Sequence, residues 1–565
     1  MSTRSAAPAT PSIEPPGPGR WTRDAARYPR PVTPTLSALL PRAAARGFHA
    51  ATRPYGLLLD HIEWGFVDGW AYMGPRRIPP LRDAQIRDRR SWDALVEGSP
   101  ELRRRLRASG RVFERRVWRS ELAQWRGVDR PARAAANAAI ASVDPEALDD
   151  PELDQALRSA CANVAEAIRI HHLYDATPAV AVGDLLVHVE QWTGSPAVEH
   201  LDLLGRGPRS VLGADELAAL ADAVRSDPAA ARAIPDGIDG TEVIPALQAL
   251  GGDMAGAVAA VLDAVGWWCA ASTCDVDEPS AVEVPGLLGD ALRAAVTRAS
   301  EGSEAAHDRA SEVRAAVPVW RRQEFDAMLA DARAVHRLRD ERALYADVWA
   351  VGLLRRAILA AGRRLADRGA LRDPADALEA TPRELRALLA GRGAPLAGVL
   401  TARGHRRRTA VDDVPGELGD PPWPPIPVEW LPEGSARTER AFRAFLSAMD
   451  EGARPAEPGT VRGLPASPGV HVGRARLVDG GAALGRVEAG DVLVAAAASP
   501  SLVVVFPLVG AIVTDHGGML SHAAIVAREQ GVPAVVGTGD ATRLVRDGAR
   551  VRVDGGAGVV TLLDR

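Results

Sequence analysis

The chain has 565 residues, of which 47% are hydrophobic and 25% charged, and its formal net charge is −5 at pH 7. This length predicts several domains, and the composition excludes a disordered chain and gives no sign of a DNA or RNA partner. Every one of the 68 basic residues is an arginine. The missing lysine excludes a Walker A loop and a Schiff-base enzyme, because both need a lysine amine.

The N-terminal segment and the cysteines predict the compartment. Residues 1–20 contain no apolar stretch of signal-peptide length, so we expect a short disordered tail. No later stretch approaches the roughly 20 apolar residues of a membrane span, so we expect no membrane partner. The three cysteines form no C-x-x-C pair, which excludes a structural zinc site and a disulfide framework. A cytoplasmic protein is therefore predicted.

Residues 21–411 have the periodicity of a large helical domain. Apolar residues recur every three or four positions and are interrupted by Gly, Pro and Asp-Pro. In the stretch 321–368, five apolar residues fall on one helical face, and Gly369 follows as a predicted C-cap. These five residues are Phe325, Met328, Leu329, Ala332 and Val335. The pattern predicts that this face packs into a core.

The chain changes character after residue 411. Residues 412–460 form a Pro-rich connector that is predicted to be extended, apart from one helix at 436–449. Residues 461–565 then predict a small α/β domain with short strands and one helix near 521–530. The predicted strands are 471–478, 491–497, 509–515, 534–539, 549–555 and 558–563.

The segment 513–539 carries the residues best suited to chemistry. Gly517 and Gly518 predict a tight turn between a strand and a helix that starts near Ser521. His522 therefore lies in the first turn of that helix, where exposed N–H groups and the positive end of the helix dipole favour an anion. A neutral imidazole in that place is a competent nucleophile for a phosphoryl group. The alternative is a surface histidine at a strand-to-helix turn.

The run GGMLSHAAIVAREQGVPAVVGTG resembles the phosphohistidine signature of the PEP-utilising enzymes, which include phosphoenolpyruvate synthase, pyruvate phosphate dikinase and rifampicin phosphotransferase. The resemblance extends over the whole of 461–565. It implies a swivelling β/β/α domain whose histidine, here His522, carries phosphate between two distant sites. The phosphate-supporting residues would be Gly517, Gly518, Ser521 and Arg528. Leu520 departs from the threonine of several relatives.

The helical region resembles, more diffusely, the middle substrate-binding part of rifampicin phosphotransferase and the large subunit of phenylphosphate synthase. The fold class implied is a large helical substrate domain followed by the swivelling domain. Arg339 occupies the position of an arginine at the phosphoryl acceptor site, and Arg342 lies near a family lysine that is missing here. His171 and His172 could line the acceptor pocket, but adjacent residues face different sides of a helix, so at most one is expected to contribute.

Asp275, Asp277 and Glu278 lie close together in the sequence and offer hard oxygen ligands. Clustered carboxylates of this kind can hold Mg²⁺. The alternative interpretation is a solvated acidic loop that ends at Pro279.

The predicted architecture lacks one part of the resembled enzymes. In those enzymes an N-terminal ATP-grasp domain phosphorylates the histidine, whereas here the helical region begins directly after the tail. We therefore expect one half of a split phosphotransferase, in which a separate ATP-grasp protein uses ATP to phosphorylate His522. The helical domain would bind a small-molecule hydroxyl acceptor, with Mg²⁺ as cofactor. The alternatives are a non-catalytic phosphate-responsive regulatory protein, or an enzyme with non-phosphoryl chemistry such as elimination.

Overall fold

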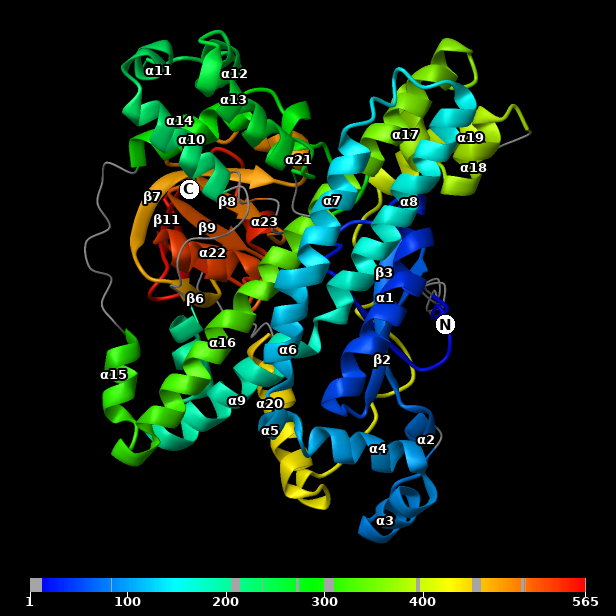
Figure 1. Ribbon diagram of the computed structural model, residues 1–565, viewed down its shortest axis with the longest axis vertical. Coiled ribbons are helices and arrows are strands. Elements are labelled where there is room, and N and C mark those ends of the chain that lie inside the picture. The colour runs from blue at the N-terminus through cyan, green and yellow to red at the C-terminus, as the bar shows by residue number, and fades with distance from the viewer. Residues whose placement is uncertain are drawn as a thin grey trace, which may run out of the picture.

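Long helices build the frame of the region before residue 450 (Figure 1). The computed structural model describes residues 13–82, 84–204, 214–235, 237–270, 274–298, 309–392, 397–449, 459–498, 502 and 505–563. Helix α1 (Pro34–Tyr55) packs along α8 (Asp150–Leu173), and α17 (Trp349–Asp367) packs on the other side of α8. A second group places α9 (Ala176–Thr193) between α16 (Arg322–Arg342) and α20 (Glu433–Ala448).

Glycines set the closest helix crossings. A Cβ atom added at Gly47 of α1 would lie 2.3 Å from the carbonyl oxygen of Arg169 in α8. One added at Gly183 of α9 would lie 1.8 Å from the carbonyl oxygen of Ala441 in α20. Because no side chain fits there, α20 packs directly on the helical region. The helix predicted in the connector is thus present, and it belongs to this packed frame.

Shorter helices complete the region. Between α1 and α9 lie α2 (Pro79–Arg82), α3 (Arg89–Gly98), α4 (Pro100–Ser109), α5 (Val112–Arg115), α6 (Val117–Gln124) and α7 (Arg130–Ala141). Figure 1 shows a separate lobe built by α10 (Ala214–Ser226), α11 (Pro228–Ala233), α12 (Gly240–Gln248), α13 (Gly252–Val261) and α14 (Leu287–Arg298). The others are α15 (Arg309–Ala316), α18 (Pro382–Leu389) and α19 (Ala397–Arg408). No described helix combines the length and the apolar character that a membrane span requires.

The helical region also contains strands that its periodicity did not predict. Strands β2 (Leu59–Val67) and β3 (Trp70–Arg77) form a hairpin, and β1 (Arg20–Arg23) and β4 (Glu417–Gly419) extend it to the order β2-β3-β1-β4. The turn residues Asp68 and Gly69 have φ values of 50° and 85°, as a two-residue hairpin turn requires. The mostly helical character predicted for residues 21–411 therefore does not hold for residues 59–77.

The segments that were expected to be tail and connector take part in this sheet. Residues 1–12 and 450–458 lie outside the described residues. Residues 13–19, in contrast, lie against the hairpin, where the carbonyl oxygen of Gly17 accepts a 2.8 Å hydrogen bond from Trp21 Nε1. In the connector, Leu418 of β4 pairs with Trp21 of β1. The connector is held because β4 pairs with β1, and residues 13–19 are held by their contact with Trp21 of the same sheet.

Short π-helical turns interrupt the described helices at 125–129, 262–266 and 343–348. The third separates α16 from α17, so the long helix predicted for 321–368 is broken once. Four of its five predicted core residues are buried, and Met328 is partly buried. Gly369 has φ 70°, in agreement with the predicted C-cap. A π turn inserts one extra residue and redirects the side chains beside it.

The C-terminal unit is a mixed sheet with helix α22 (His522–Gln530) packed on one face. Its strands are β5 (Thr460–Arg462), β6 (Leu464–Ser467), β7 (Val470–Val478), β8 (Val492–Ala495), β9 (Ala511–Thr514), β10 (Ala534–Val536), β11 (Arg550–Asp554) and β12 (Val559–Leu562). The sheet order is β5-β12-β11-β7-β8-β9-β10-β6; strands β7, β8, β9 and β10 run parallel to one another, and the other pairs are antiparallel. The six predicted strands and the predicted helix are confirmed, and the short helices α21 (Gly481–Leu484) and α23 (Ala541–Leu544) complete the unit.

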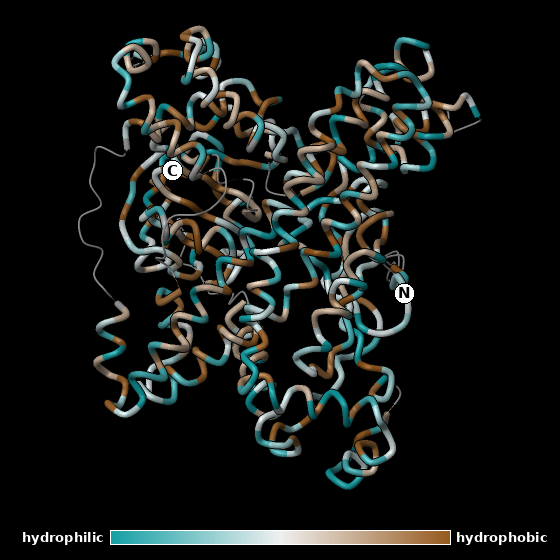
Figure 2. Tube along the Cα trace, viewed as in Figure 1, coloured by the Kyte–Doolittle hydropathy of each residue, from teal (hydrophilic) through white to brown (hydrophobic). Residues whose placement is uncertain are grey.

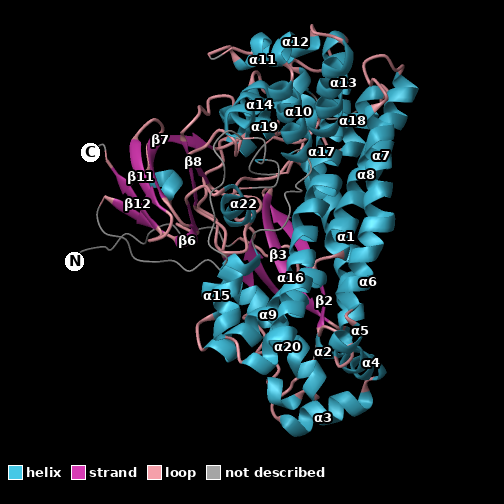
Figure 3. Ribbon diagram, turned by 60° about the vertical axis from the view of Figure 1, so that its left-hand side comes forward, coloured by secondary structure: helices cyan, strands magenta, loops and turns pink. Residues whose placement is uncertain are grey.

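The C-terminal unit is docked on the helical region. One cluster of buried apolar side chains includes Leu36 and Trp268 of the helical region together with Leu484 and Phe506 of the C-terminal unit. Figure 2 shows how apolar residues, in brown, alternate with hydrophilic residues along the helices. Helix α22 lies on the side of the sheet that faces the helices (Figure 3). The two parts therefore share a core.

Candidate functional site

His522 occupies the first position of α22, directly after the N-cap residue. The Ser521 side chain accepts a hydrogen bond from the backbone N–H of Ala524, and Gly531 ends the helix in the left-handed conformation. His522 is 7% exposed, and its ring centroid lies 6.1 Å from that of Phe506. The helix boundaries predicted from the sequence are thus confirmed, and the imidazole lies beside the positive end of the helix dipole.

Gly517 and Gly518 shape the turn that leads into α22. Gly517 has φ 116°, a conformation that favours glycine, and a Cβ atom there would lie 2.8 Å from Cβ of Ser521. A Cβ atom on Gly518 would lie 2.7 Å from the carbonyl oxygen of Met449, just after α20. The first glycine therefore permits the turn, and the second permits close docking on the helical region.

Arg528 holds this turn in place. Its Nη2 donates a 2.8 Å hydrogen bond to the carbonyl oxygen of Met519, and its Nη1 donates a 2.9 Å bond to that of Ala466 in β6. Arg528 was predicted to support a phosphate, which stays a prediction. Two donors of its guanidinium bind backbone carbonyls, so the side chain fixes the loop before His522.

Arg339 of α16 reaches the loop before His522 (residues 517–521) from the helical region. Its Nη1 donates to the carbonyl oxygen of Leu520 and lies 3.2 Å from Sδ of Met449. Leu520 itself is fully buried among side chains of α9 and α16. The position that departs from the family threonine thus anchors the loop to the helical region. Arg339, which was predicted for the acceptor site, thus binds the carbonyl oxygen of a residue two positions before His522.

Arg342 follows Arg339 by almost one helical turn and holds the end of α8. It donates a 2.6 Å hydrogen bond from Nη1 to the carbonyl oxygen of His171, and its Nη2 pairs with Asp175. Burial would raise the pKa of Asp175, but Arg342 and His172 outweigh it and hold that pKa well below its usual range. The two predicted arginines therefore share one face of α16.

The two predicted histidines lie in the same cluster. His172 Nδ1 is 2.7 Å from Asp175 Oδ2, and its ring stacks on Phe48 with centroids 4.6 Å apart. Burial lowers the pKa of His172 to about 4, so its ring is neutral at pH 7. The His171 and His172 centroids are only 4.8 Å apart. The two rings thus lie close together near the end of α8, and the expectation that at most one of them contributes to an acceptor pocket stays a prediction.

Asp347 is a site residue that the sequence did not reveal. It lies in the π turn after α16, and its Oδ2 pairs with His171 Nδ1. Asp347 stands alone in an apolar helical stretch, and its partner is 176 positions away. The π turn redirects it toward α8, which no helical periodicity predicts.

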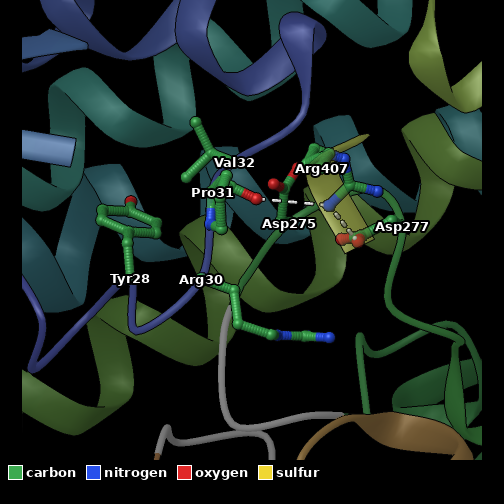
Figure 4. A pocket seen from close by; sticks show the side chains of 7 residues that line it. All are labelled: Tyr28, Arg30, Pro31, Val32, Asp275, Asp277 and Arg407. Carbon is green, nitrogen blue, oxygen red and sulfur yellow. Dashed lines mark hydrogen bonds and ion pairs between the residues drawn. The ribbon is translucent and has the colours of Figure 1, made fainter. Parts of the chain in front are cut away.

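The predicted magnesium ligands form a different structure (Figure 4). Asp275 accepts hydrogen bonds from the backbone and hydroxyl of Thr33, and Asp277 lies 2.7 Å from Arg407. Glu278 pairs with Arg30 and accepts a 2.8 Å bond from the N–H of Gly481 in α21.

This loop corrects both interpretations made from the sequence. Asp275 and Glu278 are each 3% exposed, so the loop is not a solvated acidic one. Their oxygens are already bound to donors and to arginines, which does not fit a Mg²⁺ site. The small pocket lined by Tyr28, Asp275 and Arg407 lies beside this ion-pair network. The loop instead connects the helical region to the C-terminal unit.

Comparisons with known proteins agree with the geometry of the C-terminal unit. Residues 487–558 match the family described as PEP-utilising enzyme, mobile domain. A phosphoenolpyruvate synthase from Aeropyrum pernix is 53% identical over 153 residues, which cover 24% of this chain and 19% of that protein. A probable phosphoenolpyruvate synthase from Archaeoglobus fulgidus is 40% identical over 144 residues, which cover 24% of this chain and 19% of that protein.

A different type of protein carries the same segment. Chondramide synthase cmdD from Chondromyces crocatus is 54% identical over 101 residues, 18% of this chain and 3% of that protein. The chain spans about a fifth or less of the length of these curated relatives. The similarity therefore concerns the unit that contains His522.

Proposed function

Because its C-terminal unit belongs to the PEP-utilising enzymes, as their mobile domain, we propose that this chain is a phosphotransferase component that carries a phosphoryl group on His522. The helical region would bind a small molecule with a hydroxyl group, and the phosphoryl group would pass from His522 to that hydroxyl. A separate ATP-grasp protein would phosphorylate His522.

The observation that carries the proposal is the contact between Arg339 and the loop of His522. Arg339 belongs to the helical region and binds the Leu520 carbonyl, two residues before the histidine. A phosphoryl group on His522 would therefore lie at the boundary between the two parts. Arg339 of the helical region and Arg528 of the C-terminal unit both bind the loop before it. Charge spreads over the equatorial oxygens of a phosphoryl group in transfer, and arginines stabilise that charge.

The proposed partner supplies the phosphoryl group. The described helices and strands belong either to the helical frame or to the C-terminal unit. The whole sequence also lacks the lysine of a Walker A loop. ATP would thus be used on another protein, with Mg²⁺ bound to its phosphates there. This arrangement requires His522 to leave the docked position, because the ring is 7% exposed in it.

The direct test is to incubate the chain with a candidate ATP-grasp protein and ATP labelled in its phosphoryl groups. We expect one acid-labile label per chain in the wild type and none in His522→Ala. His471→Ala is the matched control, because His471 lies on β7 of the same unit and should leave labelling unchanged. Absence of label on the wild type with every partner tested would contradict the proposal.

A second experiment separates transfer from storage. The labelled chain, freed of ATP, is mixed with candidate hydroxyl compounds, and the label is followed onto the small molecule. We expect Arg339→Gln to accept the label on His522 but to release it to an acceptor at least tenfold more slowly, because a charge-stabilising group is lost. Equal transfer rates in both proteins would remove Arg339 from the reaction.

The docked interface also favours a second candidate function. Gly518 contacts the backbone at Met449, and Gly481 bonds to Glu278, so a phosphoryl group on His522 could act by releasing these contacts. The chain would then be a phosphate-responsive regulatory protein. Label that stays on His522 while the two parts separate, with no small-molecule product, would favour this alternative.

A further inference from the structure

Four side chains with metal-ligand chemistry meet at the ends of α8 and α16. His171, His172 and Asp175 each offer one ligand atom, and these atoms lie within 4.8 Å of one another. Asp347 joins them through its contact with His171. The set differs from the Asp275 loop, because two imidazoles stand beside two carboxylates, and among the described residues Arg342 is the arginine that forms an ion pair with the set. It is also separate from the loop of His522.

Two atoms of this cluster are buried without a hydrogen bond. Among the residues that the structure describes, neither His171 Nδ1 nor Asp347 Oδ1 has a hydrogen-bond partner. His171 Nδ1 lies close to Asp347 Oδ2, but their angles are not those of a hydrogen bond. Buried polar atoms are nearly always satisfied, and an ion is one of the partners that can satisfy them. The His171 nitrogen and the Asp347 carboxylate face one another closely enough to act as two ligands of one cation.

The surroundings give the cluster the second layer of bonds that metal sites have. Asp175 Oδ2 lies 2.7 Å from Nδ1 of His172, and its Oδ1 pairs with Arg342. Because Nδ1 of His172 is bonded to the Asp175 carboxylate, Nε2 is the nitrogen of this ring that is left for a metal ion. A carboxylate that orients a histidine in this way is the usual support for a metal ligand. Phe48 and Trp64 fix the plane of the same ring, with centroid distances of 4.6 and 5.0 Å.

We propose that His171, His172 and Asp347 bind one divalent transition-metal ion, with Asp175 and Arg342 positioning the site. Imidazole ligands suit Zn²⁺, Co²⁺ or Mn²⁺, whereas Mg²⁺ prefers oxygen ligands and water. His172 is 6% exposed and the other three side chains are each about a fifth exposed, so the cluster lies in a largely enclosed place. The proposal does not depend on phosphoryl transfer, although the site lies one turn of α16 from Arg339.

The ion would have a chemical use if transfer takes place. Arg339 and Arg342 are three residues apart, which corresponds to a rise of about 4.5 Å along the helix. One of them touches the loop of His522, and the other touches the ligand cluster. A Lewis acid at this position could lower the pKa of an acceptor hydroxyl.

Binding of Co²⁺ to the chelator-stripped full chain tests the proposal. We expect one Co²⁺ per chain, a visible absorption band of coordinated Co²⁺ and a rise in the thermal midpoint. His171→Ala and Asp347→Asn should each weaken binding at least tenfold. Two controls should bind like the wild type: His405→Ala, which removes an exposed histidine of α19, and His522→Ala, which removes the proposed phosphoryl carrier.

Two results would overturn the inference. One is a wild-type chain that binds no more Co²⁺ than His171→Ala does. The other is binding that persists in His171→Ala, His172→Ala and Asp347→Asn alike, which would place the ion elsewhere. Far-UV circular dichroism checks that each variant is folded, and Asp347→Asn keeps the test valid if a histidine variant is not, because this carboxylate is 20% exposed. His522 labelling reports separately on the proposed phosphotransfer.

Discussion

Burial of the Asp275 carboxylate makes its contribution to the stability of the fold depend on pH. Burial, and after it the nearby charge of Asp277, raise its pKa to about 7, although Thr33 and Arg407 act in the opposite direction. The folded chain therefore keeps this proton in a pH range where the unfolded chain, with a pKa of 3.8, has lost it. Stability must fall as pH rises through this range, because the unfolded state then binds fewer protons.

We expect the stabilisation from protonated Asp275 to be fully present below pH 3.8, the pKa in the unfolded chain. It should be lost as the pH rises to about 7, the pKa in the folded chain. The loss is on the order of 4 kcal/mol, at about 1.4 kcal/mol for each pH unit. Urea unfolding of the wild type and Asp275→Asn at a series of pH values measures it. The variant should lack this slope, whereas Asp413→Asn, at an exposed position, should keep it. Identical slopes in all three proteins would contradict the assignment.

The sequence predicted individual site residues unevenly. His522, Gly517 and Ser521 could be placed because a strand, a glycine turn and a cap occur consecutively in the chain. Asp347 could not, because its role depends on a π turn and on a partner far away in sequence. Arg528 and the Asp275 loop were assigned to ligands because sequence shows the charge of a side chain, but not the internal carbonyl or arginine that it meets.

At the scale of elements, the C-terminal strands were predictable because each alternates or is uniformly apolar between clear turns. The hairpin at 59–77 carried a signal of its own, the Asp-Gly pair at 68–69, which favours a two-residue turn. It was missed because the surrounding helical periodicity dominated the interpretation. The break at 343–348 had no such signal, since residues 343–354 are apolar apart from Asp347 and Gly352, so one extra residue in a π turn leaves no visible shift in the pattern.

The turn before α22 offers a prediction at this scale, through Gly518. A Cβ atom at this position would lie 2.7 and 2.8 Å from backbone atoms of Met449, which cannot rotate away. We expect Gly518→Ala to lower the free energy of unfolding by about 1–3 kcal/mol, the usual cost of overpacking. Urea denaturation measures this difference.

Gly556→Ala is the matched control for Gly518→Ala. Gly556 lies between β11 and β12, and its nearest atom to an added Cβ is 3.7 Å away, so the change should cost less than about 0.5 kcal/mol. Hydrogen exchange should also increase in α20 and α22 only for Gly518→Ala. If the two variants lose the same stability, the close contact with Met449 does not hold the turn.

At the scale of the whole molecule, the docked position of the mobile domain controls access to His522. Three contacts hold the domain at different places: the Arg339 bond to Leu520, the seat of Gly518 on Met449, and the bond between Glu278 and Gly481. The third lies on α21, away from the histidine, so it can be removed without changing the residues beside His522.

Glu278→Ala should therefore expose His522 without altering its surroundings. The change removes the acceptor of the Gly481 N–H and the partner of Arg30, and hydrogen bonds to a charged group contribute about 1.5–3 kcal/mol. This corresponds to an increase of roughly tenfold or more in the undocked fraction. Modification of His522 by diethyl pyrocarbonate, followed by mass spectrometry, should accelerate by the same factor.

Graded variants make this experiment decisive. Arg30→Ala removes only the ion pair to Glu278, since its side chain is 43% exposed, and should accelerate modification less. Glu488→Ala changes a carboxylate that is 74% exposed on the same unit and should have no effect. Modification of the exposed His405 should stay constant in every protein, which separates undocking from general unfolding. If Glu278→Ala leaves the rate at His522 unchanged, the loop at 275–278 does not hold the domain, and the docked state must depend on the shared apolar core and on the contacts of Arg339 and Gly518.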